Sequence, residues 1–331
     1  MLKKTPWMVA TAITIALGGV AQAEWKPTKP VEFIAISGPG GGTDNFARMV
    51  QSIIAKHKLM DQSVIVTNKG GGSGAEGLVY AKAAAGDPHK LTFGTNNAYL
   101  LPYVAKLAYK PSDVTPVAAM AMDEFLIWVN ADSPYKDVKS FVEAAKAKPQ
   151  TVKMGGSQSK DTDQTLTSLI EDATGSKFIY IPFKGGGEAG VQLAGGHIDA
   201  NTNNPNENIG QWKAGAIRPL CVFSPARLAE GPKVTATMGW SDIPTCQEEG
   251  LPIEQFQMPR TVWLPGGAPS EAVAFYANVL KKVSETPEWK EYIERTSQTD
   301  RFLAGEELKK FVAGDEAKNK KVFEREGWVV N

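Results

Sequence analysis

The sequence has only two cysteines and three histidines among its 331 residues. These residues do not fall at the spacings by which zinc sites are recognised. Beyond the N-terminus, no stretch approaches the roughly 18 apolar residues of a transmembrane helix. Basic and acidic residues are balanced at 36 each, and no segment carries a basic stripe. We therefore expect no metal or other cofactor, no later membrane span and no nucleic-acid partner.

The N-terminus has the order of a secretory signal peptide. Lys3 and Lys4 precede an apolar run at residues 8–17, and Ala21-Gln22-Ala23 supplies small residues at the cleavage positions. The apolar run is too short to span a bilayer, although an uncleaved anchor is the alternative. No cysteine lies at the cleavage point, so a lipid anchor is not indicated. We expect residues 1–23 to be removed after Ala23 in the periplasm, and the mature chain to begin at Glu24.

The two cysteines, Cys221 and Cys246, leave two alternatives open. In an oxidising compartment they could form a disulfide that closes a loop of about 25 residues. They could equally be two buried thiols that pack as small apolar side chains. Sequence alone does not place their Cα atoms, so it does not decide between the two.

Apolar runs alternate with helical patterns along the mature chain. This alternation predicts an α/β fold of mostly parallel sheets flanked by helices. We expect two lobes: residues 24–123 plus 254–331 form one, and residues 124–253 form the other. The chain is expected to cross between them near residues 122–125 and 254–262, and the last 60 residues are expected to be mostly helical. Strands are predicted at residues 31–37, 63–67, 91–95, 117–121, 125–130, 151–155, 178–183, 198–202, 217–223 and 261–265.

Four loops share one design, in which a strand ends, a turn of small residues follows and a helix begins. They span residues 37–44, 94–99, 155–163 and 183–189. Glycine lets backbone N–H groups approach a ligand, and a helix N-terminus adds unpaired donors, so such loops suit an anion. Each loop alone is also consistent with a plain strand-to-helix turn. The candidate binding residues in these loops are Ser37, Gly38, Gly41, Gly42, Thr43, Asp44, Asn97, Ser157, Gln158, Thr162, Lys184, Gly185, Gly186 and Gly187.

Three further features of the sequence each allow more than one interpretation. Asp44 and Glu188 are expected to cap their helices, although either could instead receive a ligand ammonium or hydroxyl group. Asn203 and Asn204 could read the far end of a ligand or could simply form a turn. The segment Gly72-x-Gly74-x-x-Gly77 matches a dinucleotide fingerprint, but no acidic residue ends the next strand.

The sequence gives little support for an enzyme. The segment Gly155-Gly-Ser-Gln-Ser does not match a nucleophile elbow, which requires glycine at the fifth place. None of His57, His89 and His197 has a nucleophile close by in sequence. A secreted hydrolase that uses Ser157 or Ser159 is retained as an unfavoured alternative.

These loops belong to a series of motifs that spans the mature chain from Val31. In order and spacing, the series resembles the substrate-binding proteins of tripartite tricarboxylate transporters, the Bug or TctC family. The motifs are Gly40-Gly-Gly-Thr-Asp44 with Arg48, Val66-Thr-Asn-Lys-Gly with Gly74-x-x-Gly77, Ile181-Pro-Phe-Lys-Gly-Gly-Gly-Glu-Ala189 with Gly195-Gly-His-Ile-Asp199, Pro219-Leu-Cys-Val-Phe-Ser with Arg227, Ile243-Pro-Thr, Glu249-Gly250 and Trp263-Leu-Pro.

The resemblance implies a two-lobed type II periplasmic binding fold without catalytic activity. It implies that the loops at residues 37–44 and 183–189 hold one ligand carboxylate, largely through backbone N–H groups. It also implies delivery to a large and a small membrane subunit driven by an ion gradient. A role as sensor input to a signalling receptor is the alternative, and a monomer is expected.

Departures from the family pattern bear on the ligand. Ser37 stands where many members carry an aromatic residue, which opens the near end of the pocket. A second departure, at residues 87–90, lies outside the ligand loops. Asn203 and Asn204, together with Arg260, leave room for a second carboxylate at the far end. A di- or tricarboxylate, aromatic or short and aliphatic, is therefore expected as the ligand.

Overall fold

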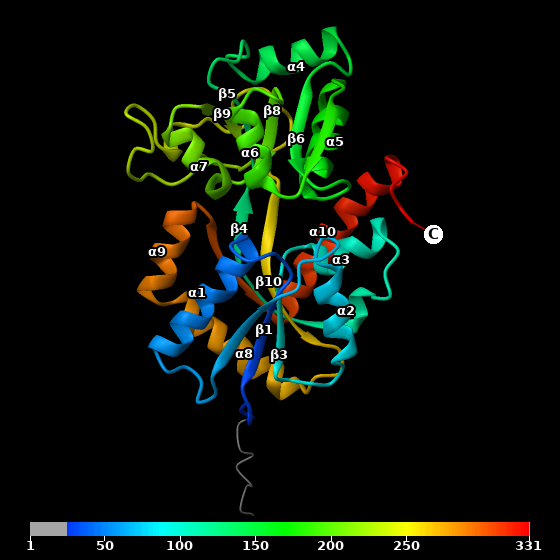
Figure 1. Cartoon of the computed structure of the whole chain (residues 1–331), viewed down its shortest axis with the longest axis vertical. Coiled ribbons are helices and arrows are strands. Elements are labelled where there is room, and N and C mark those ends of the chain that lie inside the picture. The colour runs from blue at the N-terminus through cyan, green and yellow to red at the C-terminus, as the bar shows by residue number, and fades with distance from the viewer. Residues whose placement is uncertain (1–24, 331) are drawn as a thin grey trace, which may run out of the picture.

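A computed structural model describes residues 25–330, so the predicted signal peptide at residues 1–23 lies outside the described part. Figure 1 shows two lobes stacked along the long axis of the molecule. Each lobe is a β-sheet with helices packed on both faces, which confirms the predicted two-lobed α/β fold. No helix in the described part is long and apolar enough to cross a bilayer.

The first lobe is built on a six-stranded sheet of order β11-β4-β10-β3-β1-β2. Strands β2, β1 and β3 pair in parallel, whereas β10 pairs antiparallel with both β3 and β4. Strand β4 therefore runs in the same direction as β1. Most strands of this sheet point the same way, as predicted, but most neighbouring pairs are antiparallel. The strands are β1 (Val31–Ala35), β2 (Val64–Asn68), β3 (Lys90–Gly94), β4 (Val114–Glu124), β10 (Gln257–Pro265) and β11 (Thr299–Ala304).

The second lobe is built on a five-stranded sheet of order β7-β6-β8-β5-β9. Only β5 runs against its neighbours, since β6 pairs in parallel with both β7 and β8. Strand β5 is buried along four of its five residues, as expected for a strand with helices over both faces. The strands are β5 (Leu126–Asn130), β6 (Lys153–Ser157), β7 (Ile179–Phe183), β8 (Ala200–Asn203) and β9 (Ile217–Val222).

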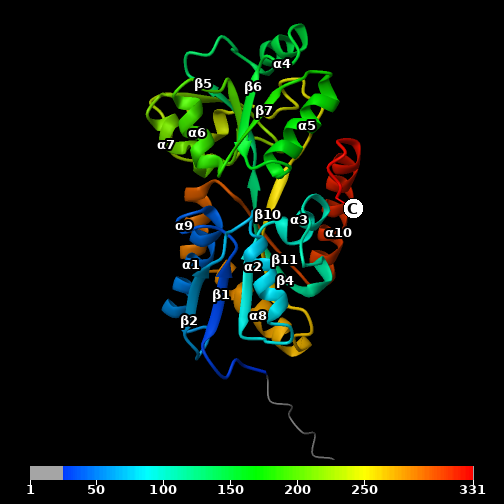
Figure 2. The same ribbon diagram turned by 45° about the vertical axis from the view of Figure 1, so that its right-hand side comes forward.

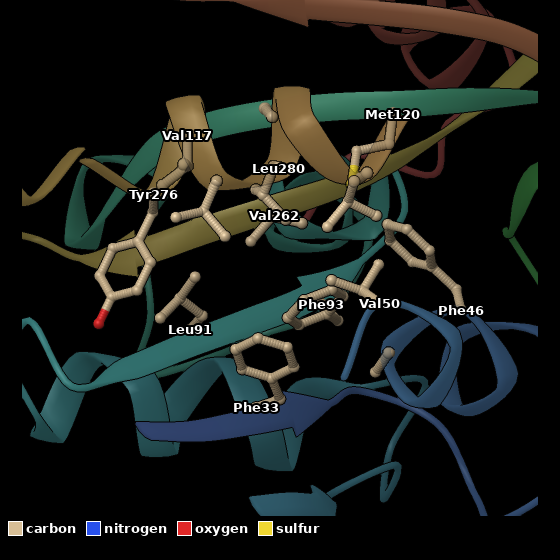
Figure 3. Close-up of a cluster of buried hydrophobic side chains, with 14 of the residues drawn as sticks. Phe33, Phe46, Val50, Leu91, Phe93, Val117, Met120, Val262, Tyr276 and Leu280 are labelled. Atoms are coloured by element: carbon tan, nitrogen blue, oxygen red, sulfur yellow. The ribbon is translucent and has the colours of Figure 1, made fainter. Parts of the chain in front are cut away.

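Helices cover both faces of each sheet because each helix has one apolar stripe. Helix α1, for example, buries Phe46, Val50 and Ile53, which recur at helical spacing. Figure 3 shows Phe46 and Val50 packed with Phe33 and Phe93 of the first sheet. The helices are α1 (Gly42–Lys56), α2 (Ala75–Ala83), α3 (Asn97–Val104), α4 (Val138–Ala147), α5 (Thr162–Thr174), α6 (Gly186–Ala194), α7 (Pro205–Lys213), α8 (Ser270–Ser284), α9 (Pro287–Thr296) and α10 (Gly305–Arg325).

Two segments carry the chain between the sheets. Strand β4 ends at Glu124 and β5 begins at Leu126, so a single residue, Phe125, separates the two strands. The return leads into β10, whose first residue, Gln257, pairs with Glu124. The link between β4 and β5 and the start of β10 therefore lie side by side where the lobes meet, as Figure 2 shows.

The C-terminal helix α10 also reaches the second lobe. Arg325 at its end lies 2.7 Å from the carboxylate of Asp172 and donates to the carbonyl of Ser168 at 3.1 Å, both on α5. The hydroxyl of Ser168 in turn donates to Glu326 at 2.5 Å. Polar contacts thus link the C-terminus, drawn in red in Figure 1, to a helix of the other lobe.

One strand differs from the sequence prediction, which treated the last 60 residues as mostly helical. Residues 299–304 form β11 and pair with β4 at the edge of the first sheet. The segment carries Asp300 and Arg301 and therefore lacks an apolar alternation. Charged side chains are common on edge strands, where they discourage pairing with other chains.

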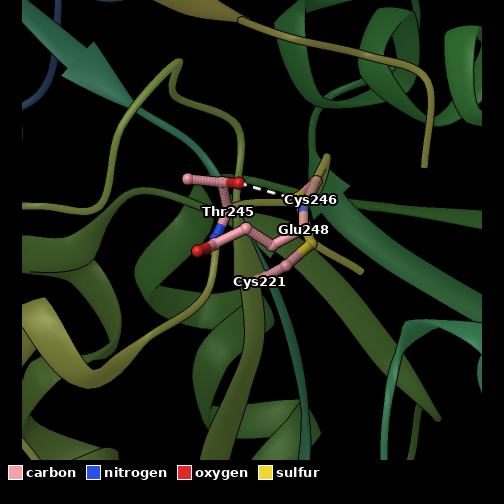
Figure 4. The surroundings of a disulfide bond; sticks show 4 residues. All are labelled: Cys221, Thr245, Cys246 and Glu248. Atoms are coloured by element: carbon pink, nitrogen blue, oxygen red, sulfur yellow. Dashed lines mark hydrogen bonds between the residues drawn. A yellow bond between two sulfur atoms is a disulfide. The ribbon is translucent and has the colours of Figure 1, made fainter. Parts of the chain in front are cut away.

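Cys221 and Cys246 form a disulfide, one of the two alternatives left open by the sequence. Both residues are fully buried in the core of the second lobe, with a Cα–Cα distance of 4.9 Å. Beside the bridge, Thr245 and Glu248 exchange hydrogen bonds: the Thr245 N–H donates at 2.7 Å and the Glu248 N–H at 3.1 Å (Figure 4). The bridge therefore ties the segment after β9 to that strand.

The double variant Cys221→Ala/Cys246→Ala should lower the free energy of unfolding by about 3 kcal/mol, because the bridge restricts the unfolded chain. Equilibrium urea unfolding, with and without reductant, measures the effect. Reductant should destabilise the parent protein and leave the double variant unchanged. Equal stability of parent and variant under oxidising conditions would contradict the assignment.

Candidate ligand-binding cleft

A cleft of about 330 Å³ lies between the two lobes. Its walls come from the loops after β1, β2, β3, β6, β7 and β8, from Phe125 between β4 and β5, and from the crossing strand β10. Ligand sites in open α/β sheets are expected at such carboxyl ends of strands. Of the predicted residues, the cleft brings together Ser37, Gly38, Gly41, Gly42, Thr43, Asn97, Ser157, Gln158, Thr162, Lys184, Gly185, Gly186, Asn204 and Arg260.

The loop before α1 is held by its own polar groups. The backbone N–H of Asp44 donates to the Ser37 hydroxyl at 3.1 Å, and the N–H of Gly40 donates to the Asp44 carboxylate at 2.8 Å. That carboxylate also accepts from Arg48 and Asn68, both at 2.9 Å. Burial raises the pKa of Asp44, but the hydrogen bonds from Arg48, Gly40 and Asn68 outweigh it and hold the pKa below its usual value. Asp44 therefore braces the loop and does not line the cleft.

Two helices, one from each lobe, present unused backbone donors at the cleft. Within residues 25–330, no hydrogen bond engages the N–H groups of Gly42 and Thr43 at the start of α1. The same is true of Gly186 and Gly187 at the start of α6. Unpaired N–H groups and the positive end of the helix dipole favour an anion at both helix starts. Gly187 itself does not line the cleft.

The loop before α5 differs because its own acids accept from two of its backbone N–H groups. Asp161 accepts from the N–H of Thr162 at 2.7 Å, and Asp163 accepts from the N–H of Ser157. A comparable contact joins Glu188 to the backbone N–H of Lys184 at 3.1 Å, which confirms capping as the role of Glu188. In the loops before α1 and α6, no side chain in the described part of the chain accepts from the N–H groups of the first two helical residues, so these two helix starts are the candidate anion sites.

Asn203 and Asn204 have different roles: the first supports a helix start, and the second lines the cleft. Asn203 donates to the carbonyl of Gly186 at 2.8 Å and to Asn208 at 2.9 Å. Its side-chain hydrogen bonds therefore hold the start of α6 in place. It lies outside the cleft wall, contrary to the expectation that it reads a ligand. Asn204 does line the cleft, and its amide donates to the carbonyl of Glu124 at 2.8 Å.

Arg260 lies in the wall but is not a free cation. Its side chain is 6% exposed and forms an ion pair with Asp123, which is 1% exposed. The guanidinium also donates to the Thr43 hydroxyl at 3.3 Å, and a Cβ added to Gly42 would lie 2.7 Å from it. Burial lowers the pKa of Arg260, but Asp123, Tyr292 and Glu207 together outweigh this and raise the pKa. The predicted second carboxylate would therefore meet an arginine that Asp123 already neutralises.

Three acids that sequence reasoning missed complete the wall: Asp161, Asp163 and Glu207. Burial raises the pKa of Glu207 to about 7, only partly opposed by Arg260. Burial also raises the pKa of Asp163 well above its usual value, and the charge of Glu207 adds to the shift. Asp163 and Glu207 stand in the first turns of α5 and α7, the helices that follow β6 and β8. That position is the signal by which the sequence could have indicated them.

The remaining wall residues are small or apolar and carry no polar side chain beyond two hydroxyls. They lie at strand ends and in the crossing segments. The sequence predicted those segments, but these side chains were not chosen as candidate binding residues. They are Ile36, Pro39, Gly70, Ser73, Thr95, Phe125 and Met258.

None of the histidines lines the cleft. His57 contacts Glu288 at 3.0 Å, and His89 contacts Asp87 at 3.1 Å, both in the first lobe. Ser157 therefore has no imidazole beside it to act as a base, and the hydrolase alternative gains no support. No cluster of metal-ligating side chains occurs in residues 25–330.

Comparisons with known proteins point to one family. The sequence profile described as "Tripartite tricarboxylate transporter family receptor" (TctC) matches residues 46–328. The chain is 27% identical to the "UPF0065 protein in gbd 5'region" of Cupriavidus necator, over 96% of this chain and 94% of that protein. It resembles a crystal structure of a TctC solute-binding protein from Polaromonas, with 27% identity and a TM-score of 0.71, over 90% of this chain and 99% of that chain. An R. palustris structure with adipate shares the fold at 24% identity and a TM-score of 0.80, over 91% and 98% of the two chains.

Replacing Arg260 by glutamine should destabilise the protein by about 3–5 kcal/mol, because Asp123 would remain buried without its partner. Arg227→Gln is the matched control, since Arg227 pairs with Glu248 at the exposed surface and should change stability little. Urea unfolding of both variants measures the difference. Equal effects of the two substitutions would contradict the assigned role of the buried pair.

Proposed function

This chain belongs to the TctC family of tripartite tricarboxylate transporter receptors, and from this premise we propose that it captures a small carboxylate in the periplasm. The interlobe cleft is the proposed site, and the membrane subunits of a tripartite transporter are the proposed recipients. The chain acts as a binding protein and not as an enzyme. The family membership agrees with the resemblance drawn from the sequence motifs.

One observation carries the proposal: the starts of α1 and α6 present unused N–H groups to the same cleft from opposite lobes. A carboxylate between them receives donors from Gly42 and Thr43 on one side and from Gly186 on the other. This arrangement requires no unpaired arginine, because backbone dipoles supply the positive potential. It also joins the two lobes through the ligand, so that binding favours a closed arrangement.

The proposal extends to the organisation of the chain. Residues 24–123 with 254–331 act as one lobe and residues 124–253 as the other, joined at Phe125 and at the start of β10. The adipate in the R. palustris structure supports the capacity of this fold to hold a carboxylate. It does not select the ligand of this chain, whose cleft walls carry their own side chains.

Export and delivery complete the proposed role. Residues 1–23 direct the chain to the periplasm, where it acts as a monomer. The family description supports coupling to a tripartite transporter. In the proposal, this transporter has a large and a small membrane subunit, and an ion gradient drives the transport. The alternative of a sensor input uses the same cleft with a different partner, and nothing in the described residues favours it.

A screen of mono-, di- and tricarboxylates by thermal unfolding should identify ligands that raise the melting temperature. At a hundredfold excess over the dissociation constant, a ligand stabilises the folded state by about 2.7 kcal/mol. Sugars that lack a carboxylate serve as the negative set. If sugars raise the melting temperature and no compound with a carboxylate does, the proposed function is wrong.

Gly186→Ala should weaken binding of any carboxylate found in that screen by about tenfold or more, equivalent to about 1.4 kcal/mol. A Cβ at Gly186 would overlap the carboxylate of Glu207 and the amide of Asn203, so the start of α6 must shift. Gly187→Ala is the matched control, since its Cβ would meet nothing within 4 Å. Calorimetry measures both affinities, and equal affinities would show that the start of α6 does not hold the ligand.

A further inference from the structure

The charges around the cleft are unevenly distributed between the two lobes. On the first-lobe side, Arg260 and Asp123 neutralise each other in a buried ion pair. On the second-lobe side, the wall carries Asp161, Asp163 and Glu207. The only other cation in the wall is Lys184, whose residue is exposed. A ligand with two or three negative charges would thus enter a cleft whose walls already carry an excess of carboxyl groups.

Glu207 is placed beside the proposed carboxylate site. It belongs to the first turn of α7, and its carboxylate lies against Gly186, so that no Cβ fits there. Within residues 25–330, the Glu207 carboxylate accepts no hydrogen bond and forms no ion pair. Arg260 attracts it across the cleft but pairs with Asp123 instead. The Glu207 carboxylate therefore faces the cleft, and both of its oxygens are free to accept hydrogen bonds.

Asp163 provides a second, independent sign of a missing donor. Its side chain lines the cleft and the residue is only 3% exposed. One carboxylate oxygen, Oδ2, accepts from the N–H of Ser157, whereas Oδ1 has no hydrogen-bond partner within residues 25–330. Oδ1 is not enclosed by protein atoms but is open to the cleft, so a donor from a ligand can reach it. The charge of Glu207 contributes to the raised pKa of Asp163, and both side chains line the same cleft.

We propose that the ligand is an amino carboxylate, with its carboxylate at the starts of α1 and α6 and its ammonium group between Glu207 and Asp163. This inference rests on the proposed function and narrows its substrate class. An ammonium group offers three donors and one positive charge, which match the carboxyl oxygens of Glu207 and Asp163 that accept no hydrogen bond from the described part of the protein. The helix starts and the two acids lie in the same cleft, so one small zwitterion satisfies both. The assignment adds an ammonium group to the carboxylate expected from the sequence.

The same geometry gives a dependence on pH with a defined sign. The charged groups that face Glu207 are Arg260 on β10, Asp123 on β4 and Asp163 on α5. Burial among them raises the pKa of Glu207 to about 7 in the unliganded protein. An ammonium group binds the ionised carboxylate, so affinity for an amino carboxylate should fall as the pH drops from 8 to 6. A carboxylate without an amino group should show no such fall.

The experiment compares matched ligands that differ only at one carbon. Two sets are used: L-aspartate, (S)-malate and succinate, and L-phenylalanine, L-3-phenyllactate and 3-phenylpropionate. Calorimetry at pH 8 measures each affinity for the parent protein. The amino compound of at least one set should bind about tenfold or more tightly than its two counterparts, which corresponds to about 1.4 kcal/mol.

Glu207→Gln removes the charge and keeps the shape of the side chain. It should abolish the preference for the amino compound and leave the affinity of the counterpart without an amino group unchanged or higher. Glu271→Gln is the matched control, because Glu271 stands in the first turn of α8 and is exposed. Should Glu207→Gln fail to fold, the ligand sets and their pH dependence in the parent protein decide the question alone.

The outcomes separate the two levels of inference. If succinate or 3-phenylpropionate binds as tightly as the amino compound, the amino-carboxylate assignment is overturned and carboxylate capture stands. If no compound in either set binds and sugars do, the proposed function itself fails. A preference for the amino compound that persists in Glu207→Gln would overturn the role of Glu207.

Discussion

The antiparallel pairing of β4 and β10 is the constraint on which the rest of the structure depends. These two strands are the longest of the first sheet, and the end of β4 and the start of β10 carry the chain between the lobes. The pairing sets Gln257 opposite Glu124, and one residue later β5 begins a different sheet. The lobes cannot drift apart, because both connections run through hydrogen-bonded strands at one place.

The same pairing fixes the charges at the base of the cleft. Asp123 and Arg260 come from the two crossing strands, so their ion pair forms wherever the strands are in register. Glu124 lies beside them, accepts from Gln257 and from Thr299 at 2.6 Å, and is almost fully buried. Burial raises the pKa of Glu124 to about 7, and Asp123 adds to the shift. The crossing thus holds polar groups that only strand pairing can keep buried together.

Sequence reasoning succeeded where local chemistry decides the outcome. The glycines before α1 and α6 indicated open helix starts, because a loop without a capping side chain leaves N–H groups unused. It failed where a partner comes from elsewhere in the chain. Arg260 was considered a free cation because Asp123 lies 137 positions away in sequence. Glu207 was missed because its position matters only once α7 packs beside the start of α6.

The contacts between the lobes differ greatly in strength, and this difference bears on how the cleft can work. At the crossing, the chain is buried and paired, as Phe125 and Asp123 show with 1% exposure each. Away from it, Arg325 and Asp172 meet at the surface with 35% and 60% of their side chains exposed. Exposed pairs of this kind contribute little to stability. The strong contacts therefore act at the crossing and the weak ones at the rim, so a ligand in the proposed site would add a comparatively large share of the binding energy between the lobes.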